Sequence, residues 1–258
     1  MMVLKGYTSS LDWPKPVHRP CGDIDIWQFG KQKEEDELLR KEKGTKIDKS
    51  HHHHTVFQWG DFTVENHYDF INVHHHKSNV EYEKILKELG QDDSKSIDVC
   101  GEKVYLPSPD LHALFLLKHL MLHFASEGIS IRQLLDWAFF VEKHGEEVDW
   151  SMVDNTLEKY GMKEMYGILN AICVEELGFC ASIFSFVQFN PLTKEKVLKD
   201  IMQTRLSDEK SSCIFKRVFF RYRRWKNNGW KHELCFKESM WSAFWAGVWN
   251  HLLKPSSI

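Results

Sequence analysis

The sequence predicts an α+β fold, in which a small mixed β-sheet is followed by an all-helical region. Three observations predict it: short β-like runs fill the first 105 residues, Pro107-Ser108-Pro109 breaks the chain, and apolar residues then recur with a helical period. At about 150 residues per domain, a chain of 258 residues forms one large domain or two small ones. We therefore expect a sheet-containing domain at 1–105 and a helical domain at 106–258.

The elements before residue 106 follow from local patterns. Residues 23–29 alternate acidic and apolar side chains, which is the period of a strand with one polar face. Residues 31–43 place opposite charges three and four positions apart and precede Gly44, which indicates a solvated helix that ends there. The other elements predicted in this half are a strand at 2–4, a hairpin of 55–59 and 62–70 around Gly60-Asp61, a helix at 80–89 and a second hairpin within 97–106.

The elements after residue 106 are all expected to be helices. Asp110 is placed to cap the first of them, and Asp149 or Ser151 to cap the third, because short polar side chains accept hydrogen bonds from free amides at a helix start. The predicted helices are 110–125, 130–144, 151–160, 163–177, 193–204, 208–225 and 237–253.

Composition narrows the class of protein. With 42% hydrophobic and 28% charged residues, the chain can bury a core. A formal charge of -3 disfavours a protein that coats nucleic acid, because such proteins usually carry a basic excess. The six cysteines include no Cys-x-x-Cys pair, which is typical of free thiols in a reducing compartment. The sequence contains no signal peptide and no stretch of the roughly 20 apolar residues that span a bilayer, so we expect a cytoplasmic protein.

The most informative motif is Gly22-Asp23-Ile24-Asp25-Ile26. On a strand, side chains two residues apart share a face and lie about 6.6 Å apart, so both aspartates point one way and both isoleucines point into the core. Two carboxylates on one face repel each other, and a divalent cation between them removes that repulsion. Mg²⁺ is such an ion, usually held by one or two carboxylates together with substrate phosphates. A solvated polar face is the alternative interpretation of this short pattern.

A third carboxylate is predicted in the next hairpin. Within residues 62–70, the side chains of Glu65, His67 and Asp69 share one face of a strand. If this strand pairs beside the Asp23 strand, Glu65 faces the same metal ions, and Asp69 is the reserve candidate. Two ions held in this way can activate an attacking hydroxyl and stabilise a leaving pyrophosphate.

These motifs together resemble a known family, the uncharacterised bacterial nucleotidyltransferases of the DNA polymerase beta-like superfamily. The stretches that carry the resemblance are Leu4-Lys5-Gly6, Trp13-Pro14-Lys15-Pro16, Arg19, Gly22 to Ile26, Val64 to His67, Leu111 to Asp136 and Trp245 to Pro255. The resemblance touches most of the chain and implies a nucleotidyltransferase core with a C-terminal helical domain. It also implies transfer of a nucleoside monophosphate from an NTP such as ATP to an acceptor.

The resemblance implies roles for particular residues. Asp23, Asp25 and Glu65 would be catalytic and would bind Mg²⁺ or Mn²⁺, and Glu65 would accept the proton of the acceptor group. The other positions at which we expect nucleotide or substrate contacts are Lys5, Gly6, Ser9, Arg19, His67, His119, His123 and Arg132. The sequence does not identify the acceptor; a small molecule, a protein and an RNA all stay open, with a long nucleic acid disfavoured by the charge.

Two departures from the family pattern keep an alternative open. Family members follow the first strand with Gly-Gly or Gly-Ser, whereas Gly6 precedes Tyr7 here, so that Ser9 or Ser10 must supply any hydroxyl. The usual longer N-terminal helical region is also missing. Both departures favour a catalytically silent module that binds a nucleotide or a partner.

The remaining histidines and basic residues allow further interpretations. His119 and His123 have the i, i+4 spacing of a helical zinc pair, so a zinc-dependent hydrolase is a third hypothesis. The histidine runs at 51–54 and 74–76 are expected in loops or at an exposed strand end. Basic and aromatic residues interleave at 217–231, as on a helix with aromatics packed inward or, alternatively, on a surface that contacts RNA or a membrane.

Overall fold

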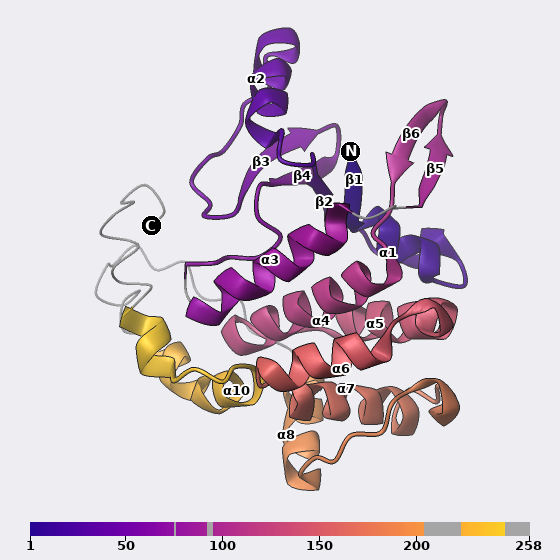
Figure 1. The fold of residues 1–258 in the computed structure, drawn as a ribbon, viewed down its shortest axis with the longest axis vertical. Coiled ribbons are helices and arrows are strands. Elements are labelled where there is room, and N and C mark those ends of the chain that lie inside the picture. The colour runs from indigo at the N-terminus through magenta and orange to yellow at the C-terminus, as the bar shows by residue number, and fades with distance from the viewer. Residues whose placement is uncertain (75, 92–94, 204–222, 246–258) are drawn as a thin grey trace. The chain divides into compact units, whose positions relative to one another are not determined.

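The computed structural model describes residues 1–74, 76–91, 95–203 and 223–245. Its architecture confirms the predicted α+β class (Figure 1), with a mixed six-stranded sheet in the order β3-β4-β2-β1-β6-β5. The strands are β1 (Met2–Lys5), β2 (Asp23–Trp27), β3 (His54–Trp59), β4 (Phe62–His67), β5 (Ser96–Val99) and β6 (Glu102–Tyr105).

Three helices are interleaved with the strands and the others follow them. The interleaved helices are α1 (Tyr7–Asp12), α2 (Gln32–Lys43) and α3 (Lys77–Gln91). The later ones are α4 (Pro109–Ser126), α5 (Ile131–His144), α6 (Trp150–Lys159), α7 (Lys163–Glu175), α8 (Pro191–Met202) and α10 (Gly229–Cys235). Most predicted helices are confirmed within a few residues, whereas α1 and α10 were not predicted. The helices predicted at 208–225 and 237–253 extend into 204–222 and 246–258, which lie outside the described residues.

The sheet has one apolar face and one polar face near its centre. β2 runs antiparallel to β1 and parallel to β4. Val3, Ile26 and Val64 from these three strands are buried together in one hydrophobic cluster, joined by Ile24 at its edge. Because side chains alternate along a strand, the aspartates of β2 point to the opposite face of the sheet.

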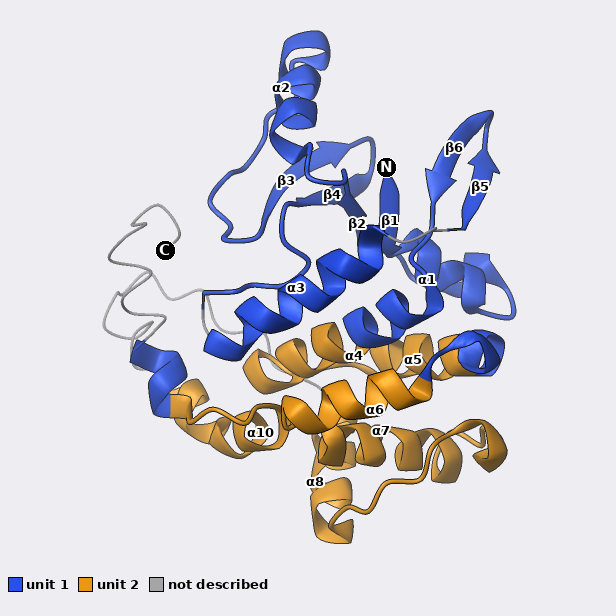
Figure 2. Ribbon diagram, viewed as in Figure 1, with its two compact units in different colours: residues 1–116, 142–149, 241–258 blue, residues 117–141, 150–240 orange. Residues whose placement is uncertain are grey.

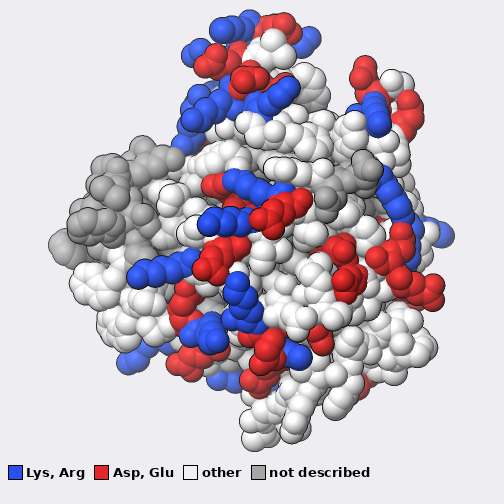
Figure 3. Space-filling model, viewed as in Figure 1, with Lys and Arg blue, Asp and Glu red and all other residues white. Residues whose placement is uncertain are grey.

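Helix α2 is anchored to the β3–β4 hairpin by a buried carboxylate. Asp36 accepts hydrogen bonds from Gln32 Nε2 (2.5 Å), Thr55 Oγ1 (3.1 Å) and Asn66 Nδ2 (2.9 Å). The rest of the helix is solvated, as predicted, and Figure 3 shows acidic and basic side chains together on it at the top of the view. The network fixes Asn66, which lies in β4 between Glu65 and His67.

The chain divides into two compact units (Figure 2), one of residues 1–116, 142–149 and 241–258 and the other of 117–141 and 150–240. The second unit has a core of buried aromatics around Trp137, whose Nε1 donates a hydrogen bond to Asn170 Oδ1 at 3.0 Å. Lys118 is also buried there, 4.8 Å from the centre of the Phe236 ring, and burial lowers the pKa of its ammonium to about 8. Among the described residues, no helix has the length and apolar character needed to cross a membrane.

Candidate active site

Strand register brings two of the predicted carboxylates together. β4 pairs with β2, in parallel, so the condition set for Glu65 is met, and Glu65 lies directly beside Asp25 in the register. Asp23 lies two residues before Asp25 on the same strand and therefore on the same face. Because Ile24 and Val64 are likewise paired on the opposite face, the hydrophobic cluster fixes this register.

A β-bulge in β1 places the Lys5 side chain beside Asp25. The β1–β2 register runs from Met2 beside Trp27 and Val3 beside Ile26, and then shifts so that Lys5, instead of Leu4, lies beside Asp25. An extra residue in one strand turns the side chains that follow to the other face. The Lys5 ammonium is consequently 4.0 Å from Asp25 Oδ2, and the two residues are only 5% and 0% exposed. The buried carboxylate therefore has a buried counter-charge.

His67 lies closer to Asp25 than Lys5 does. Its Nε2 is 3.0 Å from Asp25 Oδ1, and its Nδ1 is 3.0 Å from the backbone carbonyl oxygen of Asp69. A carbonyl oxygen carries no proton, so Nδ1–H is the donor in that hydrogen bond. Burial lowers the pKa of His67, but its hydrogen bond to Asp25 and its interaction with Glu65 outweigh burial and raise it to about 9. At neutral pH the ring is therefore an imidazolium between two carboxylates.

Glu65 is more exposed than its neighbours Asp25 and His67. Its side chain is 25% exposed, and its Oε2 is 3.7 Å from Nε2 of both His54 and His67. Burial raises the pKa of Glu65, but the interaction with His67 and the neighbouring His54 lower it below its ordinary value, so the group is ionised at neutral pH. Asp25, Glu65 and His67 each offer a ligand atom within 4.8 Å of the others, a set that fits a divalent cation. Asp23 shares the face but is not in that set.

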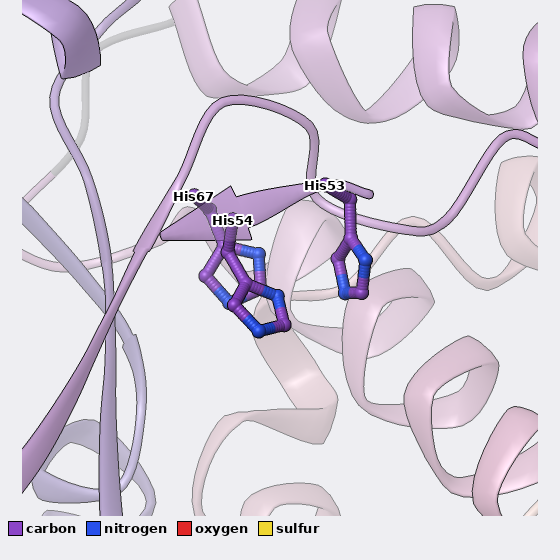
Figure 4. Close-up of side chains that lie close together, drawn as sticks. All are labelled: His53, His54 and His67. Carbon is purple, nitrogen blue, oxygen red and sulfur yellow. The ribbon is translucent and has the colours of Figure 1, made fainter. Parts of the chain in front are cut away.

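Two more histidines lie beside this group. Figure 4 shows the rings of His53, His54 and His67 extending to the same side of the β3–β4 strand pair. His54 is the first residue of β3 and the cross-strand neighbour of His67, with ring centres 5.1 Å apart. Burial and the neighbouring histidines lower the pKa of His53 to about 2 and that of His54 to about 4. The expectation of a loop or an exposed strand end is therefore confirmed for His53, which lies in the bend before β3, and is wrong for His54, which is a buried residue of that strand.

The turn after β1 lies against the Asp23 strand. Gly6 has φ +78°, and a Cβ atom there would lie 2.4 Å from the carbonyl oxygen of Asp23, so no other residue fits this turn without a shift. Helix α1 follows with three buried hydroxyl residues. Thr8 donates to the carbonyl of Val3 and Ser10 to the carbonyl of Tyr7. The hydroxyl of Ser9 has no hydrogen-bond partner among the described residues.

Arg19 and Asp69, which were also predicted as site residues, make contacts with other parts of the chain. Arg19 is buried and its Nη1 donates to the carbonyl of Pro20 at 3.4 Å. β4 ends at His67, so Asp69, the reserve carboxylate, lies beyond the strand, and its Oδ1 contacts Lys87 Nζ on α3. Asp69 contributes to the site through its backbone carbonyl, which orients His67.

The remaining predicted residues lie in the second unit. His119 and His123 are on α4, with their Nε2 atoms 3.3 Å apart, and Glu127 Oε1 is 2.5 Å from His123 Nδ1. Arg132 is in the first turn of α5 and is half-buried. The proposed substrate contacts of these three side chains stay predictions.

Sequence reasoning missed the roles of Lys5 and His54 around the carboxylates. The contact of Lys5 with Asp25 depends on a bulge that no local pattern announces. His54 had a usable signal: counting outward from the Gly60-Asp61 turn pairs Trp59 with Phe62 and reaches His54 beside His67.

Comparison with known proteins gives one match. A family model described as an uncharacterised nucleotidyltransferase matches residues 1–178, which include all the strands and the whole acidic group. Neither a search of curated proteins nor one of solved structures found a match. Because the family model spans more than half of the chain and its match includes the Asp25–Glu65 pair, the protein belongs to this uncharacterised nucleotidyltransferase family.

Proposed function

We propose that the protein is a divalent-metal-dependent enzyme that transfers a nucleoside monophosphate from an NTP to an acceptor. The observation that carries this proposal is the register that sets Glu65 beside Asp25, on the strand face shared with Asp23. Three carboxylates on adjoining strands form an oxygen-rich ligand set of the kind that Mg²⁺ or Mn²⁺ takes. Family membership supports nucleotidyl transfer as the reaction class.

The reaction forms one bond and breaks one. The acceptor oxygen, or another nucleophilic atom, attacks the α-phosphorus of the NTP, and the bond from that phosphorus to the bridging oxygen of pyrophosphate breaks. The acceptor gives up its proton and pyrophosphate leaves as an anion. When bound, a divalent cation supplies charge neutralisation for the triphosphate and lowers the pKa of an attacking hydroxyl.

Each residue of the group has a proposed task. Asp23 and Asp25 hold the metal, and Glu65 completes the ligand set and accepts the acceptor's proton, since it is ionised and partly exposed. Lys5 lies near enough to these carboxylates to face the charge of a bound phosphate as well. His67 holds Asp25 in place and keeps a proton between the two carboxylates while no cation is bound.

The turn that follows β1 is the proposed phosphate contact. Gly6 lets the chain approach the Asp23 strand closely, and the backbone amides that follow it can reach a triphosphate without obstruction by a side chain. We assign Ser9 as the residue that supplies the hydroxyl given by the serine of Gly-Ser in other family members. The hydroxyls of Thr8 and Ser10 already donate to backbone carbonyls, whereas that of Ser9 has no partner among the described residues. Arg19, His119, His123 and Arg132 stay candidates for contacts with phosphate or acceptor.

A second candidate function is nucleotide binding without turnover. The contacts of Asp25 favour it, because Lys5 and His67 already neutralise this carboxylate in the absence of a cation. In such a module, the nucleotide would bind beside the sheet without metal-dependent release of pyrophosphate.

The test is labelling with each of ATP, GTP, CTP and UTP, labelled at the α-phosphate, in the presence of Mg²⁺ or Mn²⁺. A host-cell extract supplies the acceptor pool, and mass spectrometry of the labelled product gives its class: small molecule, protein or RNA. Asp23→Asn and Glu65→Gln should each abolish labelling while the fold is retained. Asp61→Asn, at the exposed tip of the same hairpin, is the matched control and should label normally. A folded wild type that binds a nucleotide and labels nothing would establish the silent module instead.

A further inference from the structure

His53 is held beside β4 by its own backbone. Its carbonyl oxygen accepts hydrogen bonds from the amides of Tyr68 and Asp69, each at 3.1 Å. Successive residues of a strand face opposite ways, but His53 lies in the bend before β3 and is free of that alternation. Its ring can therefore lie on the same side as those of His54 and His67, as Figure 4 shows.

The rings of His53 and His54 contain buried nitrogens without hydrogen bonds. Nδ1 of His53 and both ring nitrogens of His54 have no hydrogen-bond partner within the part of the chain that the structure describes. Most buried polar atoms in proteins have a hydrogen-bond partner, so three such atoms in adjacent rings point to a site that binds a ligand. Imidazole nitrogens are common ligands of divalent metal ions.

We propose that His53, His54 and His67 bind a transition-metal ion of the zinc class, with Glu65 as an oxygen ligand. One nitrogen from each of the three rings lies within 4.8 Å of the others. A tetrahedral zinc ion with ligands at about 2.0–2.1 Å has ligand atoms about 3.4 Å apart. Glu65 Oε2 is 3.7 Å from Nε2 of His54 and from Nε2 of His67, which makes this carboxylate the oxygen ligand that we assign beside the three rings.

The hydrogen bond from His67 Nδ1 to the Asp69 carbonyl is of the kind that orients metal-binding histidines. A ligating histidine usually donates its other ring N–H to a carbonyl or a carboxylate, which fixes the nitrogen that faces the metal. The Asp69 carbonyl accepts from Nδ1 of His67 in this way, so Nε2, which contacts Asp25 Oδ1 at 3.0 Å, is the nitrogen that would bind the ion and release its proton as it does so.

This metal class differs from that of the proposed transferase reaction. Three imidazoles and one carboxylate suit zinc, cobalt or nickel, whereas Mg²⁺ prefers oxygen ligands alone. The inference therefore does not rest on nucleotidyl transfer. The two sites adjoin at Glu65, so an ion bound by the histidines would set the position and charge of that carboxylate.

The test is direct metal binding by the full chain, purified without a polyhistidine tag and treated with a chelator. Calorimetry with Zn²⁺ should give one site per chain, and Co²⁺ should produce the intense visible bands of a tetrahedral complex. His53→Ala and His54→Ala should each weaken Zn²⁺ binding by at least about 100-fold and remove the Co²⁺ bands. His52→Ala is the matched control from the same run, because its ring lies against that of His74, and it should change affinity less than about threefold.

Two outcomes would overturn the proposal. One is a failure of the wild type to bind Zn²⁺ stoichiometrically. The other is equal loss of affinity in His52→Ala and His54→Ala, which would mean that the histidine run binds the ion on its surface. Circular dichroism of each variant identifies any loss that arises from unfolding, and His54→Gln provides a second, more conservative substitution. Asp23→Asn should keep the zinc site whether or not nucleotidyl transfer occurs, which separates failure of this site from failure of the transferase.

Discussion

Replacing Gly6 with alanine should destabilise the protein through two separable effects. The residue has φ +78° and ψ −96°, which lies outside the left-handed helical region, and residues with a Cβ atom adopt such sparsely populated conformations at a cost of about 1–3 kcal/mol. The added Cβ would also lie 2.4 Å from the carbonyl oxygen of Asp23 and 3.2 Å from the Cα of Ile24. Both neighbours are backbone atoms, so the strand itself must move, and overpacking of this kind costs about 1–3 kcal/mol more. The total expected loss is about 2–6 kcal/mol.

Two other glycines isolate the two effects. Gly30 also has a positive φ, +85°, but nothing lies within 4 Å of the place that a Cβ atom would occupy, so Gly30→Ala should lose only the conformational part. Gly22 has neither constraint, and Gly22→Ala should be neutral or slightly stabilising. The assay is equilibrium unfolding in urea, with the free energy of unfolding compared across the three variants. If Gly6→Ala lost no more free energy than Gly30→Ala, the close approach of this turn to the Asp23 strand would be refuted.

Three further predictions concern side chains that make hydrogen bonds or ion pairs within the fold. Asp36→Ala should lose at least about 3 kcal/mol of unfolding free energy, because Gln32, Thr55 and Asn66 all donate to this carboxylate. Glu37→Ala, at an exposed position of the same helix, should lose less than about 1 kcal/mol. Equal losses for the two variants in urea unfolding would contradict the hydrogen-bond network. Burial raises the pKa of Glu83 from 4.5 to about 7. A raised carboxyl pKa gives stability that is present below pH 4.5 and is lost as the pH rises through 7. The wild type should therefore lose up to about 3 kcal/mol of unfolding free energy, relative to Glu83→Gln, between pH 4 and pH 8. A difference that is the same at both pH values would show that folding does not raise the pKa of Glu83. Hydrogen bonding to Asp12, with a further contribution from Glu147, raises the pKa of His144. Its stabilisation is therefore present below pH 6.5 and lost at alkaline pH, and His144→Gln should lower the melting temperature more at pH 6 than at pH 9, whereas an equal effect at both would argue against a charged His144.

The fold was largely predictable because its helices and strands have strong local signals. The apolar period after residue 106 predicted α4 to α8, and Gly44, with φ +66°, ends α2 where the charge pattern stops. Helix α1 was missed because its six residues, Tyr7–Asp12, are too few to show a period. β4 was predicted to continue to Phe70 but ends at His67, since the amides of Tyr68 and Asp69 bond to the His53 carbonyl.

The candidate site was predictable only in part. Alternation along β2 placed both aspartates on one face, and the choice of Glu65 depended on an assumed pairing that the structure has. The counter-charge from Lys5 could not be read from the sequence, because an unbulged strand would set Leu4 beside Asp25. The burial of His54 was also missed, since a run of four histidines is ordinarily solvated and only tertiary contacts cover this residue.

The central claim is that the Asp25–Glu65 pair supports metal-dependent transfer. The most direct measurement is the rate of pyrophosphate release from the preferred NTP with Mn²⁺, for wild type, Asp25→Asn and the Asp61→Asn control, each verified as folded by thermal unfolding. We expect Asp25→Asn to lose at least about 1,000-fold in rate, because removing one charged stabilising group of this kind costs about 4 kcal/mol. Asp61→Asn should match the wild type within about twofold. Pyrophosphate release by Asp25→Asn at the wild-type rate would contradict the claim.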